Sequence, residues 1–266
     1  MSAKPSPVET KQTSVALGNL LYFNGGVAIL SVAVFLLLAF LYNQRHEKEK
    51  QEIREAFQHY FSPQILDAIL KQPELLRLGG QRREVTVLFS DIRSFTTVVE
   101  RLAPQRLTEL MQEYFNEMTD AVFATNGIVD KFIGDALMAF WGAPIEQPDQ
   151  ADLAVRTAID MTERLRRLQE KWGQSGLPVL DIGIGVNLGV ATIGNFGSAK
   201  RFDYTVIGDT VNAASRLEAL NKEHKSHIII SESTKSQLTI PIEYRDLGEV
   251  SVKGKEKPVH VFEVLS

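Results

Sequence analysis

The sequence predicts a protein of the α+β class, in which strands and helices follow a βαββαβ order after a separate apolar segment. Three observations lead to this prediction. Short apolar runs have the length of strands, two long segments repeat apolar residues every three to four positions, and one long segment has no charged residue. The 266 residues, 44% of them hydrophobic, have material for one sizeable domain and an appendage.

The uncharged segment runs from Gln12 to Gln44, and residues 20–42 within it are almost entirely apolar. Because that length spans a bilayer, we expect a transmembrane helix at 20–42 after a short tail at 1–19. A cleaved signal peptide is the alternative, but the segment is long for one and has no clear small-residue cleavage site. More basic residues follow the segment closely than precede it, which places the N-terminus outside and the large C-terminal part in the cytoplasm. We therefore expect a single-pass membrane protein.

Residues 43–80 are expected to form a helical linker. Three apolar side chains follow the i, i+4, i+7 spacing of a narrow helical stripe: Ile53, Phe57 and Tyr60. The stripe fits a short parallel coiled coil and, equally, a single solvated helix. Gly79-Gly80 is expected to break the chain before a domain at 81–266.

The elements of that domain are expected in the following order. They are strand Glu84–Ser90, helix Gln105–Thr125, strands Ile128–Phe132 and Ala136–Trp141, helix Gln150–Trp172 and strand Val179–Asn187. After a Gly-rich stretch come a helix from about Asp209 to Leu220, a strand at Ile228–Ile230 and closing strands near Val250 and at Val259–Val264. The helix at Gln105–Thr125 has an unbroken apolar stripe, so its aromatic residues and methionines are expected in the core rather than around a cofactor.

Composition excludes several kinds of site. The absence of Cys excludes disulfides and thiolate metal sites. His224 and His227 are the remaining pair with any zinc-like proximity, and we expect them on a surface turn. The formal net charge of −4 argues against nucleic acid as a partner.

Two aspartates stand where strands end. Asp91 follows the apolar run "VLF" and one serine, and Asp135 lies at the tip of the hairpin formed by the next two strands. In a βαββαβ sheet the first strand and this hairpin are neighbours, so the two carboxylates are expected to converge. Converging carboxylates repel each other unless a cation lies between them, and Mg²⁺ takes one or two carboxylates together with substrate phosphate oxygens. The alternative is that each Asp only caps a turn.

Asn212 and Arg216 are four positions apart on an expected helix and so project from one face. An amide and a guanidinium suit a ribose and a phosphate, although the pair is also ordinary for a helix surface. The run Gly183-x-Gly185-x-x-x-Gly189 lies inside a strand pattern with no helix directly after it, which argues against a dinucleotide-binding fingerprint.

Three motifs, "FSDIRSFT", "DKFIGDALMAFWG" and "YTVIGDTVNAASR", together resemble the class III nucleotidyl cyclase catalytic domain. The resemblance runs from about Glu84 to Val264. It implies a ferredoxin-like palm with added C-terminal elements, and a homodimer whose active sites form between two catalytic domains arranged head to tail. The implied reaction is the conversion of ATP to 3′,5′-cyclic AMP and pyrophosphate.

By this resemblance, Asp91, the carbonyl of Ile92 and Asp135 bind Mg²⁺ or Mn²⁺, two ions per active site. The backbone near Phe95 and Thr96 lies close to the substrate phosphates. One ion would lower the pKa of the attacking 3′-hydroxyl and the other would neutralise charge on the leaving pyrophosphate.

The remaining implied roles concern the nucleotide. Asn212 orients the ribose and Arg216 stabilises the α-phosphoryl group. Lys131 donates to adenine N1, while Thr205, where an aspartate is commoner in the family, accepts from the 6-amino group. This threonine places the chain in a subclass typical of many bacterial adenylate cyclases. Lys253 resembles a family lysine near the β- and γ-phosphates, and a solvated loop lysine is its alternative.

Three other functions stay open at this point. A guanylate cyclase would use a glutamate and a cysteine at the two base-reading positions, and a diguanylate cyclase shares the βαββαβ core with two metal-binding acids. A catalytically silent nucleotide-binding or dimerisation module would bind ATP without releasing pyrophosphate.

Overall fold

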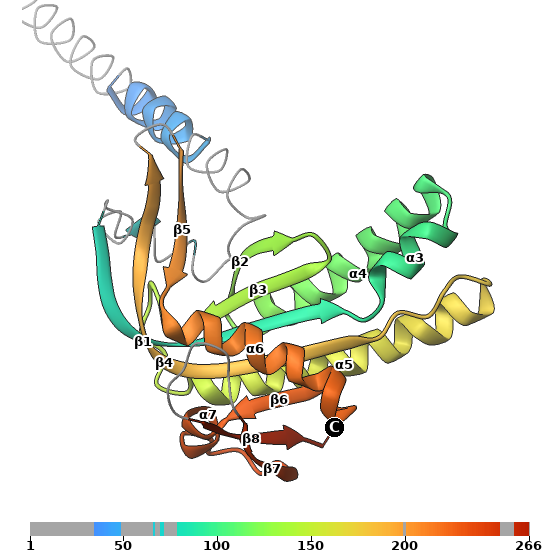
Figure 1. The fold of residues 1–266 in the computed structure, drawn as a ribbon. Helices are drawn as coiled ribbons and strands as arrows, with labels where there is room; N and C mark the ends of the chain where they lie inside the picture. The colour runs from blue at the N-terminus through green and yellow to red at the C-terminus, as the bar shows by residue number, and fades with distance from the viewer. Residues whose placement is uncertain are drawn as a thin grey trace, which may run out of the picture. The chain divides into compact units, whose positions relative to one another are not determined.

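The computed structural model describes residues 35–48, 66, 70–71, 79–198, 201–250 and 258–265 (Figure 1). The chain divides into two units, Met1–Ala56 and Phe57–Ser266. In the first unit, residues 35–48 form a helix. Most of the expected transmembrane segment at 20–42 lies outside the described residues. Within the part of the chain that is described, no helix combines the length and apolarity needed to cross a membrane.

The second unit is built on one mixed sheet in the order β2-β3-β1-β4-β6-β8-β7, with β5 paired to β4. The strands are β1 Gly79–Ile92, β2 Ile128–Ile133, β3 Ala136–Trp141, β4 Ile182–Ser198, β5 Arg201–Ile207, β6 Ile228–Ser231, β7 Tyr244–Val250 and β8 Val259–Val264. The first four, with two long helices between them, give the predicted βαββαβ order. Since β1 pairs antiparallel with both β3 and β4, it is the central strand of this palm.

Helices cover both faces of the palm. The helices of this unit, within the described residues, are α3 Phe95–Arg101, α4 Pro104–Ala124, α5 Gln150–Gln174, α6 Asp209–His224 and α7 Glu232–Ser236. α4 and α5 share one hydrophobic core with Leu88 of β1, whereas Val87 belongs to a core on the opposite face together with Ala214 of α6. Neighbouring β1 residues are thus buried on both faces, which explains the continuous apolar run. The predicted stripe of α4 is confirmed, with Leu110, Tyr114, Met118 and Val122 buried.

Several predicted boundaries were wrong. Gly79-Gly80 does not break the chain but begins β1, where Gly80 pairs with Gly194. A Cβ on Gly194 would lie 2.2 Å from the carbonyl oxygen of Gly79, so glycine lets these two strand ends meet. The Gly-rich stretch, for which no strand was predicted, contains the second half of β4 and all of β5. The short helices α3 and α7 were not predicted.

Candidate active site

Asp91 is the penultimate residue of β1, and the residue before it makes a buried polar contact. Its Oδ1 accepts a hydrogen bond of 2.8 Å from the backbone N–H of Ile92. On the preceding residue, the hydroxyl of Ser90 lies 3.3 Å from that of the fully buried Tyr114. Arg93, two residues after Asp91, binds Asp181 at 2.9 Å and donates to the carbonyl of Ser226. These contacts fix the strand end that carries Asp91.

Asp135 lies in the turn between β2 and β3, as predicted. Gly134 takes the positive φ of 67° that this tight turn requires, and Ile133 pairs with Ala136 across it. Because β3 lies beside β1, the turn brings Asp135 to Asp91, and the expected convergence is confirmed. Burial, and then the hydrogen-bonding and Coulombic interaction with Asp135, raise the pKa of Asp91 to about 6. Asp135 therefore disfavours the ionised form of Asp91.

A third carboxylate, which sequence reasoning missed, faces this pair. Burial, and then the charge of Asp91, raise the pKa of Glu218 on α6 to about 7, with Asp135 adding to the effect and Arg93 opposing it. Among the described residues, no three His, Cys, Asp or Glu side chains come close enough together to hold a metal ion. Asp91 and Asp135 are the two carboxylates that interact directly. Two hard oxygen ligands whose mutual repulsion a cation would relieve fit Mg²⁺ or Mn²⁺.

The glycines of β4 set the position of α6. A Cβ on Gly185 would lie 2.2 Å from the backbone nitrogen of Glu218 and 2.3 Å from the carbonyl oxygen of Ala214. A Cβ on Gly183 would meet the Glu218 carboxylate, and one on Gly189 would meet Thr210. The glycine run thus provides space for a helix and not for a nucleotide, which agrees with the sequence analysis.

Asn212 and Arg216 project from another side of α6. Ala214 and Leu217 are buried in the cores, whereas Asn212 is exposed and Arg216 is partly exposed. At about 100° per residue, Arg216 and Glu218 point in nearly opposite directions around the helix axis. Since Glu218 faces Asp91 and Asp135, Arg216 points away from the carboxylate pair of its own chain.

Lys131 and Thr205 come together although β2 and β5 are distant in the sheet order. Between them lies Asp130, which sequence reasoning also missed. Thr205 Oγ1 donates a hydrogen bond of 2.5 Å to Asp130 Oδ2, and Lys131 Nζ lies 3.8 Å from Asp130 Oδ1. The sequence signal that could have indicated Asp130 is an acidic residue inside the otherwise mostly apolar strand "IVDKFI".

Phe95 and Thr96 begin α3, directly after the strand end that carries Asp91 and Ile92. Ser94 precedes them in a left-handed conformation, with φ 57°, and its side chain makes no capping hydrogen bond. Lys253 lies outside the described residues.

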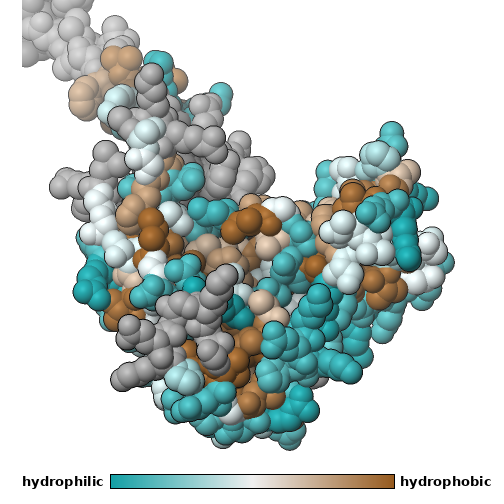
Figure 2. All heavy atoms as spheres, in the orientation of Figure 1, coloured by the Kyte–Doolittle hydropathy of each residue, from teal (hydrophilic) through white to brown (hydrophobic). Residues whose placement is uncertain are grey.

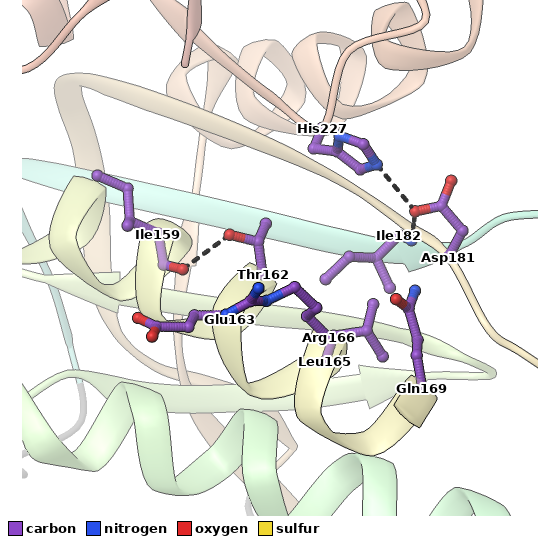
Figure 3. A pocket seen from close by; sticks show the side chains of 9 residues that line it. All are labelled: Ile159, Thr162, Glu163, Leu165, Arg166, Gln169, Asp181, Ile182 and His227. Atoms are coloured by element: carbon purple, nitrogen blue, oxygen red, sulfur yellow. Dashed lines mark hydrogen bonds and ion pairs between the residues drawn. The ribbon is translucent and has the colours of Figure 1, made fainter. Parts of the chain in front are cut away.

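A hollow of about 410 Å³ elsewhere contains none of the expected site residues (Figure 3). It lies between side chains of α5, including Arg166, and the start of β4, where Asp181 binds His227 at 3.1 Å. His227 is half exposed, which confirms its expected surface position, whereas His224 is the last residue of α6 and is partly buried rather than lying on a turn.

Comparison with other proteins identifies the family to which this palm domain, with its paired aspartates, belongs. A family model described as the adenylate and guanylate cyclase catalytic domain matches residues 80–264. The chain belongs to this class III nucleotidyl cyclase family, and its adenylate cyclase relatives make the domain that of a cyclase, a lyase.

Three similar proteins illustrate the relationship. Adenylate cyclase 1 of Rhizobium meliloti is 35% identical over 202 residues, which cover 75% of this chain and 30% of that protein. The crystal structure of the adenylyl cyclase CyaB from P. aeruginosa matches with a TM-score of 0.66 and 40% identity, over 71% of this chain and 97% of that one. The guanylyl cyclase Cya2 matches with a TM-score of 0.64 and 34% identity, over 70% and 94%. The chain spans less than half the length of the curated relatives it matches.

Proposed function

We propose that the protein is a membrane-anchored adenylate cyclase that converts ATP to 3′,5′-cyclic AMP and pyrophosphate. The observation that carries the proposal is the meeting of Asp91 and Asp135 at the C-terminal end of the central strand β1. In the reaction a bond forms between the ATP 3′-oxygen and the α-phosphorus, the bond from that phosphorus to pyrophosphate breaks, and the hydroxyl proton is released.

Asp91 and Asp135, with the Ile92 carbonyl, would hold two Mg²⁺ or Mn²⁺ ions. When bound, these ions supply Lewis acidity to the 3′-hydroxyl and neutralise charge on the leaving group. The protein's own part is to fix the carboxylates, which the anchored end of β1 and the tight turn at Gly134 do.

Other residues position the substrate. Asn212 would bind the ribose and Arg216 the α-phosphoryl group, where its charge opposes the charge that builds up in the transition state. Backbone groups at Phe95 and Thr96 would lie near the phosphates, because α3 begins there next to Asp91. Lys253 would contact the β- and γ-phosphates.

The base-reading pair favours adenine. Lys131 only donates hydrogen bonds, which suits adenine N1, and the hydroxyl of Thr205 can accept one from the 6-amino group. The contact of both residues with Asp130 supports their acting together.

A homodimer is part of the proposal, because α6 points Asn212 and Arg216 away from the carboxylates of the same chain. A complete site then needs the carboxylates of one protomer and α6 of the other. Apolar side chains on strands near the site support such an interface, because Phe132 and Ile133 of β2 and Phe202 and Ile207 of β5 are 46–52% exposed. Figure 2 shows apolar residues at the surface in the region of β2 and β5.

Anchoring by residues 20–42, with the catalytic domain in the cytoplasm, is supported by the uncharged segment and the basic residues after it. Carbonate extraction of membranes from cells that express the full chain tests this part. Release of the chain into the soluble fraction would contradict it.

The decisive experiment incubates the full chain, purified in detergent, with ATP or GTP and Mg²⁺ or Mn²⁺. The cyclic nucleotide is identified by mass, and Asp135→Ala is measured alongside. Cyclic AMP from ATP that is lost in the variant supports the proposal. Cyclic GMP as the main product would make the chain a guanylate cyclase, and ATP binding without pyrophosphate release would make it a silent module.

A further inference from the structure

A buried carboxylate lies between the two residues that are proposed to read the base. The side chain of Asp130 has no solvent exposure. One of its oxygens accepts the hydrogen bond from Thr205, and the other lies 3.8 Å from the ammonium group of Lys131. Within the described part of the chain, this second oxygen has no hydrogen-bond partner. One carboxylate therefore contacts both base-reading side chains.

The backbone aims Asp130 at this place. The register of β2 against β3 shifts between Val129 and Lys131, so that Asp130 is an extra, unpaired residue in a bulge. A bulge re-aims side chains, and here it brings the charges of two consecutive residues toward the same side. Without the bulge, Asp130 and Lys131 would point to opposite faces of the sheet.

The hydrogen bond decides what Thr205 can offer to a base. A hydroxyl has one proton and two lone pairs, so it can donate to one partner and accept from another. An ionised carboxylate only accepts, so the proton of Thr205 is committed to Asp130. The hydroxyl then has only lone pairs left for a ligand.

We propose that Asp130 is a specificity-determining residue that acts through Thr205, by making its hydroxyl a pure hydrogen-bond acceptor toward the base. Adenine presents an acceptor at N1 and a donor at its 6-amino group, which complement Lys131 and the restricted Thr205. Guanine presents a donor at N1 and an acceptor at O6, the reverse pattern. A free threonine hydroxyl would rotate and donate to O6. This inference rests on the proposed cyclase function and assigns the selection of adenine to three residues.

The test compares kcat/KM for ATP with kcat/KM for GTP in the full chain and in Asp130→Asn. The amide of Asn can itself donate to Thr205, which frees the threonine proton for guanine. We expect the ratio of kcat/KM for ATP to kcat/KM for GTP to fall by about 10-fold, because the hydroxyl of Thr205 is no longer restricted to accepting a hydrogen bond. Cyclic AMP production with an unchanged ratio overturns the proposal and leaves the cyclase function intact.

Asp152→Asn is the matched control. Asp152 is also a buried carboxylate, 5% exposed, that accepts from a threonine, here both Oγ1 and the backbone N–H of Thr239. It contacts neither Lys131 nor Thr205. Its variant should lose stability but keep the ATP-to-GTP ratio, so a fall in both variants would show a general packing effect and overturn the assignment.

A double-mutant cycle shows whether Asp130 acts through Thr205. Thr205→Val removes the hydroxyl at nearly constant volume. In that background Asp130→Asn should change the ratio no further, because the group on which it acts is gone. Equal effects of Asp130→Asn in both backgrounds would mean that Asp130 acts by another route.

The pH dependence of the unmodified protein gives a readout that needs no substitution. Burial raises the pKa of Asp130 to about 6, with the hydrogen bond from Thr205 and the charge of Lys131 opposing this shift and that of Asp203 adding to it. Below that pH, Asp130 becomes protonated and can donate to Thr205, so the ATP-to-GTP ratio should fall as the pH is lowered from about 7.5 to about 5. A flat ratio overturns the proposal even if Asp130→Asn does not fold.

Binding separates this inference from the proposed function. If the full chain makes no cyclic nucleotide, the proposed function is contradicted. The dissociation constants of 3′-deoxy-ATP and 3′-deoxy-GTP, measured by calorimetry, would then still test the role of Asp130. The same loss of discrimination in Asp130→Asn is then expected in binding. Unchanged discrimination would overturn the inference.

Discussion

At the scale of single residues, the candidate site holds negative charge at a cost to stability. The raised pKa values of Asp91 and Glu218 mean that each ionised carboxylate is less stable in the folded protein than in the unfolded chain. A folded carboxyl with a raised pKa favours the native state at low pH, and this contribution is lost as the pH rises through the folded pKa. For Asp91 the loss occurs between its ordinary value of 3.8 and about 6. A bound cation would reverse it.

Asp135→Asn should therefore stabilise the metal-free protein at neutral pH while it abolishes cyclase activity. The gain in the free energy of unfolding should be on the order of 1 kcal/mol or less, because Asp91 is only partly buried and solvent screens the interaction. Denaturant unfolding with chelator checks this. The difference between variant and wild type should be near zero at about pH 4 and grow through about pH 6. A variant that is less stable at neutral pH would mean that Asp135 has a structural role.

Removal and return of metal give the complementary prediction. Mg²⁺ should raise the melting temperature of the wild-type protein at neutral pH, because it binds the native carboxylate pair and not the unfolded chain. Asp135→Asn should show little or no rise. Differential scanning fluorimetry measures both melting temperatures. An equal rise in the two proteins would mean that the ion binds elsewhere.

Arg216→Ala should lower turnover more than it weakens ATP binding. Loss of one preorganised charge contact to the transition state typically costs about 10²–10³-fold in rate. Steady-state kinetics should thus show a large fall in kcat and a KM within a few-fold of wild type. Arg167→Ala, which removes an exposed arginine of α5 paired with Glu163, is the control and should leave both constants nearly unchanged. A raised KM at unchanged kcat would assign Arg216 to ground-state binding.

The sequence predicted the meeting of Asp91 and Asp135 because both positions follow from local rules, a strand end and a two-residue turn. It did not predict Asp130 or Glu218. Asp130 reaches Thr205 through a bulge, and a bulge shifts register without a clear sequence signature. Glu218 faces the pair because α6 packs closely on β4, which depends on tertiary contacts rather than on periodicity.

At the scale of elements, regular periodicity was a reliable guide and glycine was not. α4 and α5 were predicted within a few residues because their apolar stripes face one core. β5 and the second half of β4 were missed because glycine lowers strand propensity. In the structure, Gly194 pairs with Gly80 on one side and Thr205 on the other, where a side chain would collide with backbone.

Gly185→Ala tests whether the distance between β4 and α6 controls activity. The added Cβ would lie 2.2 Å from the backbone of α6, so the helix must move or the fold loses stability, typically by about 1–3 kcal/mol. Because Asn212 and Arg216 lie on α6, we expect kcat to fall in the protein that remains folded. Gly173→Ala is the control, since nothing lies within 4 Å of a Cβ there and alanine suits a helix. Equal activity of both variants would argue against this coupling.

At the scale of the whole molecule, one chain cannot complete the proposed site. Glu218 turns one side of α6 toward Asp91 and Asp135, and the helix geometry turns Arg216 away from them. A symmetric dimer resolves this conflict, because each protomer can present α6 to the carboxylates of its partner. Two equivalent sites then follow from the two-fold symmetry.

Mixing two inactive variants tests this arrangement. In a heterodimer of Asp135→Ala with Arg216→Ala, one site carries both substitutions and the other carries neither. Random exchange of protomers gives heterodimers in half of the population, so cyclase activity should return to roughly one quarter of the wild-type value. Each variant alone should stay inactive at every protein concentration. If the mixture is no more active than its components, the carboxylates and Arg216 serve the same site from one chain, and the orientation of α6 inferred from Glu218 is wrong.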